Sequence, residues 1–168
     1  MHTTLMPVDP TALDWRWTRF DGLSPRELQF IYMARAQVFV IEQNCIYLDV
    51  DGHDAAAFHL AAWSPGHAMP VAYARWLDPG VKYAEPSLGR VLTSAAARGT
   101  GLGRELVLRA LELGTRAHPG LAVRISAQSR LEAFYATFGF AVAGPRYLED
   151  GIPHTEMLRG ADPVDPST

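Results

Sequence analysis

The sequence predicts a mixed α/β (α+β) fold in which a central sheet carries helices on both faces. Segments with the period of a strand and segments with the period of a helix follow one another in the order β-α-β-β-β-α-β-α-β-β. The run of three strands indicates antiparallel neighbours, and the strand–helix–strand unit after it indicates a parallel crossover. Both kinds of pairing in one chain are typical of a mixed sheet.

Local patterns mark the first strand and the first helix. Leu13, Trp15 and Trp17 alternate with polar residues, as in a half-buried strand. The segment Ser24-Pro25-Arg26-Glu27 has a capping serine, a proline at the first helical position and a glutamate at the third, which is the capping-box pattern. The positions that then recur at helical spacing are Leu28, Ile31, Tyr32, Arg35, Val38 and Phe39. We therefore expect a helix that runs to about residue 39.

The later elements follow from the same rules. Strands are expected over roughly 57–63, 71–77, 88–93, 121–127, 140–142 and 155–158. A long amphipathic helix is expected after the glycine-rich turn 98–104, ending at His118-Pro119-Gly120, and a short one over 129–138.

Composition narrows the class of protein. Of 168 residues, 48% are hydrophobic and 20% charged, so we expect a single domain over 1–160 and a disordered tail over 161–168. The net charge of −3 provides no basic surface for nucleic acid, and the single cysteine is typical of a reducing compartment. There is no signal-peptide pattern and no stretch of the ~18 apolar residues that a membrane span needs. We expect a cytoplasmic protein without a membrane partner.

The turn from Arg98 to Arg104, RGTGLGR, carries the clearest chemical signal. Its three glycines leave backbone N–H groups accessible at the start of a helix, where the partial positive charge of the helix adds to them. Two arginines supply further positive charge. The turn therefore predicts a pyrophosphate site.

Two common phosphate-binding motifs do not fit this turn. A Walker loop requires GxxxxGK[ST], and no lysine follows here. A dinucleotide fingerprint that starts at Gly99 places Arg104 where the third glycine is needed, and the acidic residue expected ~20 positions later is missing. A nucleotide-dependent enzyme is therefore disfavoured. The alternative to a phosphate site is a glycine-rich turn that binds no ligand.

A metal site is not expected. Asp49, Asp51, His53 and Asp54 lie close together, but their spacing lacks the complete calcium-loop pattern and its distant glutamate. His53 and His59 also miss the usual zinc spacing. A polar turn before a strand is the better interpretation.

Arg98, Gly101 and Gly103 form an RxxGxG pattern, and the segment from Phe134 to Phe140 reads FYATFGF. These two segments resemble the [Q/R]xxGx[G/A] signature and the FYxxxGF ending of the GNAT N-acetyltransferase superfamily. Four further segments resemble the ElaA-like branch: Val38–Gln43, Gly89–Val91, Ala127–Gln128 and Glu149–His154. The resemblance extends from about residue 23 to residue 159.

This resemblance implies a partly splayed sheet with acetyl-coenzyme A in the cleft between its fourth and fifth strands. Val91, Leu92 and Thr93 would bind the pantetheine arm through their backbone. The residues that would hold the pyrophosphate are Arg98, Gly99, Thr100, Gly101, Leu102, Gly103 and Arg104. Those that would border the far side of the cofactor are Gln128, Ser129 and Phe134. A homodimer would be in keeping with the superfamily.

The implied reaction moves an acetyl group to a primary amine of a small molecule or peptide by direct attack. Tyr135 is the candidate general acid, because a phenol with a pKa near ~10 is protonated at neutral pH and can protonate the leaving thiolate. The candidate bases are Glu42 and His154, with a water relay as a further possibility. Glu149 and Asp150 are candidates to bind a cationic acceptor. The alternative function is a non-catalytic acyl-coenzyme A sensor or interaction module on the same fold.

Overall fold

An eight-stranded mixed sheet forms the centre of the computed structural model, which describes residues 6–163 and 167. The strand order is β1-β2-β3-β4-β5-β8-β6, and β7 pairs with β8 outside this path. The strands are β1 (Asp14–Arg19), β2 (Ala57–Trp63), β3 (Ala72–Leu77), β4 (Ser87–Thr93), β5 (Val123–Gln128), β6 (Phe140–Val142), β7 (Tyr147–Glu149) and β8 (Ile152–Arg159). The helices are α1 (Pro25–Arg35), the π-helical segment η2 (Ala36–Glu42), α2 (Leu102–Ala117) and α3 (Glu132–Ala136). Short 3-10 turns are η1 (Phe20–Gly22), η3 (Asp54–Ala56), η4 (Ala95–Ala97) and η5 (Ser129–Leu131).

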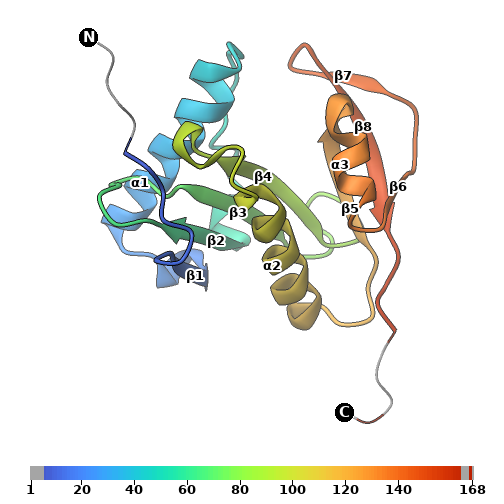
Figure 1. Cartoon of the computed structure of the whole chain (residues 1–168). Coiled ribbons are helices and arrows are strands. Elements are labelled where there is room, and N and C mark those ends of the chain that lie inside the picture. The colour runs from blue at the N-terminus through green and yellow to red at the C-terminus, as the bar shows by residue number, and fades with distance from the viewer. Residues whose placement is uncertain (1–5, 164–166, 168) are drawn as a thin grey trace.

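The sheet opens between β4 and β5. The strands β1 to β4 are antiparallel neighbours, β4 and β5 run parallel, and β5, β8 and β6 are again antiparallel. The two parallel strands share one residue pair, Ser87 with Arg124, and Figure 1 shows them diverging from there. The remaining backbone groups on these two facing edges are therefore not paired with each other. The predicted mixed and partly splayed sheet is confirmed.

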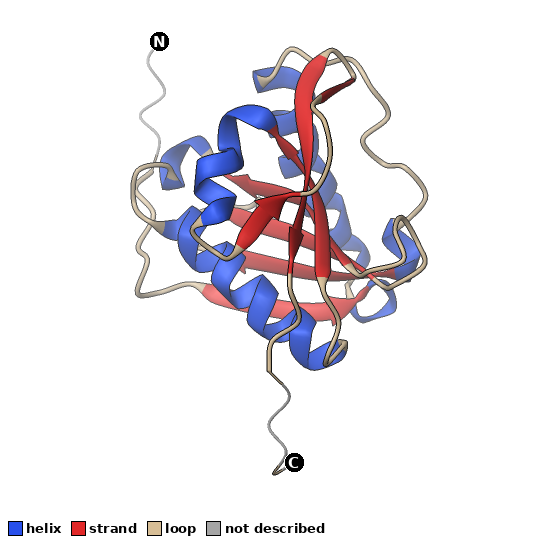
Figure 2. Ribbon diagram, turned by 90° about the vertical axis from the view of Figure 1, so that its right-hand side faces the viewer, coloured by secondary structure: helices blue, strands red, loops and turns tan. Residues whose placement is uncertain are grey.

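Separate hydrophobic cores on the two faces of the sheet hold the helices. On one face, Leu106 and Ala110 of α2 pack with Trp76 of β3. On the other face, Ile31 of α1 packs with Tyr73 of β3. Because Tyr73 and Trp76 are three residues apart on one strand, their side chains point to opposite faces. Figure 2 shows helices on both sides of the strands, which confirms that prediction.

The first helix begins as its sequence indicates. The backbone N–H of Glu27 donates to Ser24 Oγ at 3.1 Å, and the N–H of Ser24 donates to Glu27 Oε2 at 2.7 Å, so both bonds of the capping box are present. The α-helix ends at Arg35, earlier than expected, and continues as a wider π-helical segment to Glu42. A backbone bond of the wider type, from Cys45 N–H to Val40 O at 3.1 Å, closes this segment.

The segment from Glu149 to His154 is a hairpin. β7 pairs with the start of β8 through a two-residue turn at Asp150 and Gly151. Both turn residues have positive φ, 50° and 79°, as the tightest hairpin turn requires. Asp-Gly is a preferred pair for that turn, so β8 begins at Ile152, three residues earlier than predicted.

Two further expectations concern the C-terminal tail and membrane spans. The predicted tail over 161–168 lies partly outside the described residues. Within residues 6–163, no helix combines the length and the apolar character needed to cross a membrane.

Candidate functional site

A cavity of about 800 Å³ lies where β4 and β5 diverge. Its volume falls within the range of roughly 300–1,000 Å³ that small-molecule sites occupy. All seven residues of β4 line it, and the other walls come from β5, η2, the segment after η2, the β7–β8 hairpin and α3. The opening of the sheet therefore creates a site whose walls come from both halves of the fold.

The turn before α2 presents unpaired backbone donors beside this cavity. Gly99 and Gly101 have φ values of 76° and 84°, and a Cβ atom at either position would meet no atom within 4 Å. Among the residues that the structure describes, the N–H groups of Gly101, Gly103 and Arg104 have no protein acceptor. Open space, free N–H groups and the N-terminus of a 16-residue helix fit a pyrophosphate.

The two arginines of the turn point in different directions. Arg98 lines the cavity, pairs with Glu42 Oε2 at 2.5 Å and donates to the carbonyl oxygen of Thr93 at 3.1 Å. Arg104 donates to Thr137 Oγ1 at 3.2 Å and lies over the ring of Phe138. Arg98 therefore ties the turn to β4 and η2, whereas Arg104 ties α2 to the end of α3.

Tyr135 of α3 combines burial with a free hydroxyl. Its side chain is 7% exposed, lines the cavity and packs edge-on against Phe134 and Phe140. Burial raises the pKa of Tyr135 to about 12, so the phenol keeps its proton at neutral pH. Within the described part of the chain, its hydroxyl makes no hydrogen bond. The proton is therefore available to a group in the cavity.

His154 and Glu149 form a polar cluster on another wall of the cavity. His154 Nδ1 donates to the carbonyl oxygen of Ile152 at 2.7 Å, because a carbonyl can only accept. His154 Nε2 lies 3.5 Å from Glu149 Oε2. Ser126 of β5 donates to the same carboxylate at 3.2 Å and also contacts the hydroxyl of Tyr147. The ring nitrogen Nε2 can thus take a proton beside a carboxylate.

This cluster lies on the opposite face of the sheet from Tyr135. Ala127 of β5 and Met157 of β8 belong to the same hydrophobic core as Tyr135. Side chains alternate along a strand, so Ser126 and His154, each at an odd distance from those residues, point to the other face. The cavity therefore passes through the sheet, between Tyr135 on one face and His154 on the other.

Buried arginines neutralise the acidic turn after η2, a feature that the sequence interpretation missed. Arg35, 0% exposed, donates to Asp49 at 2.8 Å and to Asp54 at 2.6 Å. Arg75 donates to both carboxylate oxygens of Asp51, at 2.7 and 2.8 Å. Burial opposes the charge of Asp51, but the bonds and charge of Arg75 outweigh it and hold the pKa of Asp51 below its usual value.

The network balances the acidic charge of this turn with arginines of the same chain. Each of its three aspartates meets at least two arginine contacts, and no cluster of metal-ligating side chains occurs within the described residues. The available signal was an arginine on an otherwise apolar helix face, Arg35, and another inside an apolar strand, Arg75.

The remaining predicted site residues separate into two groups. Val91, Leu92, Thr93 and Gln128 line the cavity together with Glu42 and His154. Ser129 and Phe134 do not line it, since Ser129 Oγ bonds Thr155 Oγ1 at 2.8 Å and Phe134 packs against the core.

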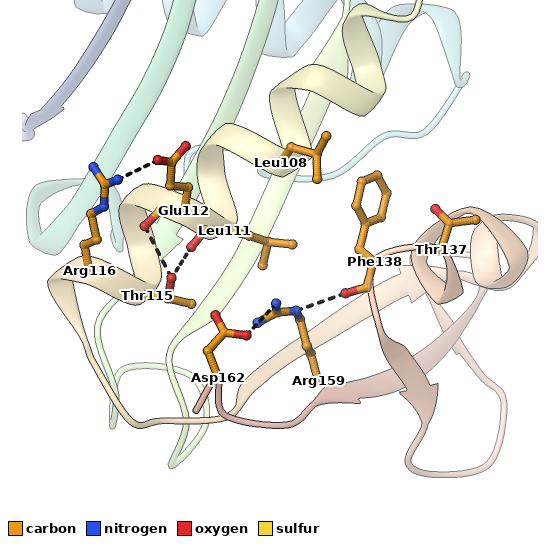
Figure 3. Close-up of a pocket in the computed structure, with 9 residues that line it drawn as sticks. All are labelled: Leu108, Leu111, Glu112, Thr115, Arg116, Thr137, Phe138, Arg159 and Asp162. Carbon is orange, nitrogen blue, oxygen red and sulfur yellow. Dashed lines mark hydrogen bonds and ion pairs between the residues drawn. The ribbon is translucent and has the colours of Figure 1, made fainter. Parts of the chain in front are cut away.

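A second cavity, of about 490 Å³, lies between α2 and the end of β8 (Figure 3). Its charged side chains already pair with one another, Arg116 with Glu112 at 2.6 Å and Arg159 with Asp162 at 2.8 Å. No residue of the glycine-rich turn lines it. The candidate site is therefore the cavity between β4 and β5.

Comparison with known proteins agrees with this geometry. The family model described as Acetyltransferase (GNAT) domain matches residues 53–159. The UPF0039 protein sll0451 of Synechocystis sp. is 43% identical over 146 residues, 87% of this chain and 94% of that protein.

Two crystal structures are also similar. An acyl-CoA N-acyltransferase from Pseudomonas aeruginosa is 41% identical with a TM-score of 0.84, covering 89% of this chain and 100% of that one. Escherichia coli ElaA is 37% identical with a TM-score of 0.81, covering 88% and 99%. The chain belongs to the GNAT acetyltransferase family, among the relatives of ElaA and the UPF0039 proteins.

Proposed function

We propose that the protein transfers an acetyl group from acetyl-coenzyme A to a primary amine by direct attack of the amine on the thioester. The observation that carries this proposal is the cavity that passes through the sheet, with a protonated phenol on one face and an imidazole–carboxylate pair on the other. Membership of the family supports acyl transfer in general.

The donor side is formed by the turn before α2 and the free edge of β4. Acetyl-coenzyme A, when bound, supplies an activated acyl group and a thiolate leaving group. The backbone donors of residues 99–104 would hold its pyrophosphate, and Val91, Leu92 and Thr93 would bind the pantetheine arm along the unpaired edge of β4. Gln128 closes the opposite wall.

In the proposed reaction, Tyr135 acts as the general acid. Its raised pKa keeps the hydroxyl protonated, and its lack of a protein partner leaves the proton free for the departing sulfur. Burial among aromatic rings fixes the direction of the phenol. Tyr135 would therefore act in the same orientation in each turnover.

On the acceptor side, we assign the base role to His154. Its Nδ1 is held by the carbonyl oxygen of Ile152, which leaves Nε2 to accept the amine proton, directly or through a water molecule. Glu149 lies next to Nε2 and would stabilise the positive charge that forms there. Glu42, the other candidate, is already paired with Arg98 and would position that arginine instead.

Isothermal titration calorimetry with acetyl-coenzyme A tests the donor site, with ATP and NAD as controls. A panel of primary amines then tests transfer through thiol release. Selective binding followed by release with at least one amine supports the enzyme. Binding without release across the panel would favour a non-catalytic acyl-coenzyme A-binding module, and a folded protein that binds no acetyl-coenzyme A would overturn the proposal.

A further inference from the structure

Arg90 has an unusual backbone conformation for its residue type. Its φ is 51°, in the left-handed region that residues with a Cβ atom rarely adopt. The pairing of β3 with β4 shifts here, because β4 has two residues, Arg90 and Val91, where β3 has one. This is a β-bulge, which bends a strand and redirects the residues that follow it.

The side chain of Arg90 makes polar contacts that can hold this conformation. Nε lies 2.6 Å from Asp49 Oδ1, and Nη2 lies 3.2 Å from Asp51 Oδ2. Nη2 also donates to the backbone carbonyl oxygen of Asp49 at 3.1 Å. The guanidinium therefore reaches from β4 to the segment after η2 and contacts two carboxylates at once.

Asp49 and Asp51, the partners of Arg90, are themselves held by other buried arginines. Asp49 is bound by the fully buried Arg35 of α1, and Asp51 is bound through both oxygens by Arg75 of β3. A shift of either aspartate would leave a buried charge without its partner, which is costly. The anchor of Arg90 is therefore rigid.

The bulge lies where it can shape the cavity. Beyond Ser87, β4 makes no residue pair with β5, so the free edge of β4 forms one wall of the cavity. The three residues after the bulged position, Val91 to Thr93, are the ones proposed to bind the pantetheine arm through their backbone.

We infer that Arg90 is a positioning residue: its contacts with Asp49 and Asp51 hold the bulge of β4, and the bulge aims the backbone of residues 91–93 into the cavity. The inference rests on the proposed function for its consequence, weaker binding of acetyl-coenzyme A. Its structural part, the anchoring of β4, does not depend on what the protein binds.

The test uses Arg90→Gly, which accepts positive φ but cannot reach the aspartates. Amide hydrogen exchange of the peptide that covers residues 88–93 reports the anchoring, urea unfolding reports global stability, and calorimetry reports the Kd for acetyl-coenzyme A. Arg19→Ala is the matched control, because it removes an arginine–aspartate pair of β1, to Asp78, that lies outside the cavity. Arg90→Lys keeps the charge but lacks the two-pronged geometry.

In Arg90→Gly we expect amide exchange over residues 88–93 to be at least about tenfold faster. We also expect the Kd for acetyl-coenzyme A to be about tenfold higher, because one or two hydrogen bonds from the backbone of residues 91–93 to the coenzyme would be lost. The control should match the wild type in both, and Arg90→Lys should lie between. Unchanged exchange over 88–93, or acceleration only in proportion to a global loss of stability, overturns the inference. Faster exchange with a Kd within twofold of wild type overturns its consequence for the coenzyme site.

Two further provisions distinguish failure of this inference from failure of folding or of the proposed function. If Arg90→Gly does not fold, Arg90→Asn replaces it, since asparagine tolerates positive φ and is too short to make the contacts. If the wild-type protein binds no acetyl-coenzyme A, the proposed function fails, and the exchange measurement still decides whether Arg90 anchors β4.

Discussion

The guanidinium of Arg98 and the carboxylate of Glu42 lie 2.5 Å apart, so the turn before α2 is tied to the end of η2. A phosphate bound at this turn would compete with Glu42 for Arg98. We therefore predict that Glu42→Gln lowers the Kd for acetyl-coenzyme A about threefold, because it frees Arg98 and removes a negative charge. The transfer rate should stay within about threefold of wild type if Glu42 is not the base. A hundredfold loss of rate with unchanged affinity would instead identify Glu42 as the base.

Removal of the Tyr135 hydroxyl should affect the chemical step alone. Tyr135→Phe keeps the aromatic packing with Phe134 and Phe140 but cannot donate a proton. We expect kcat to fall about 100-fold, at the lower end of the range for general acid catalysis, with the Kd for acetyl-coenzyme A within twofold of wild type. Single-turnover kinetics is the measurement, since it isolates the transfer step. A wild-type single-turnover rate would remove Tyr135 from the mechanism.

His154→Asn separates the two roles of this imidazole. The asparagine amide can still donate to the carbonyl oxygen of Ile152, as Nδ1 does, but it has no group in the place of Nε2. We expect transfer to slow about 100-fold without a change in coenzyme affinity, and Glu149→Gln to slow it about tenfold. Rates measured with one amine at saturating acetyl-coenzyme A give the comparison. If His154→Asn keeps full activity, a water relay or another group takes the proton.

Gly101 is expected to be essential for coenzyme binding. Its φ of 84° strains any other residue, and a side chain there would enter the open space assigned to the pyrophosphate. We predict that Gly101→Val loses about 1–2 kcal/mol of stability and all measurable affinity for acetyl-coenzyme A. Gly80→Val is the matched control, because Gly80 has a φ of 86° and equally open surroundings. Equal losses of affinity in both variants would attribute the effect to backbone strain.

Stability should fall when the pH drops below about 6.5, because of His59. This side chain is buried, its Nε2 donates to the carbonyl oxygen of Asp54 at 2.9 Å, and its Nδ1 lies 2.8 Å from the hydroxyl of Tyr73. Burial lowers the pKa of His59 from 6.5, so the folded state resists a proton that the unfolded chain accepts. The stabilisation is complete above pH 6.5 and is lost towards lower pH, with a slope of at most about 1.4 kcal/mol per pH unit.

Urea unfolding of the wild type and of His59→Gln between pH 5 and 7.5 measures this contribution. The variant should show the flatter dependence of unfolding free energy on pH. The lowered pKa of Asp54 acts in the same direction, but only below its ordinary value of 3.8, outside this window. Equal slopes for both proteins would exclude His59 as the source.

The extent to which the sequence predicts this protein depends on how local each signal is. The capping box of α1 needs four consecutive residues, so it could be predicted exactly where it occurs. The Asp150–Gly151 turn carries an equally local signal, and its hairpin could also have been predicted. The glycine-rich turn could be placed before α2 for the same reason.

The contacts that shape the site have no such local signal. Arg98 and Glu42 are 56 positions apart, and Arg90 lies 41 positions from Asp49. Such pairs form only because β4 and the turn before α2 lie beside η2 and the segment after it in the folded chain. The proposal of His154 instead of Glu42 as base therefore rests on long-range contacts, since Glu42 pairs with Arg98 and His154 Nε2 lies beside Glu149.

The passage through the sheet has a kinetic consequence. Tyr135 and His154 face the same cavity from opposite sides of the sheet. In the proposed reaction, the two substrates therefore enter the cavity by separate routes. Neither has to leave before the other arrives, and the acyl group never needs to rest on the protein. Initial-rate plots against both substrates should therefore intersect, as for a ternary complex, and should not run parallel as they do in a double-displacement mechanism.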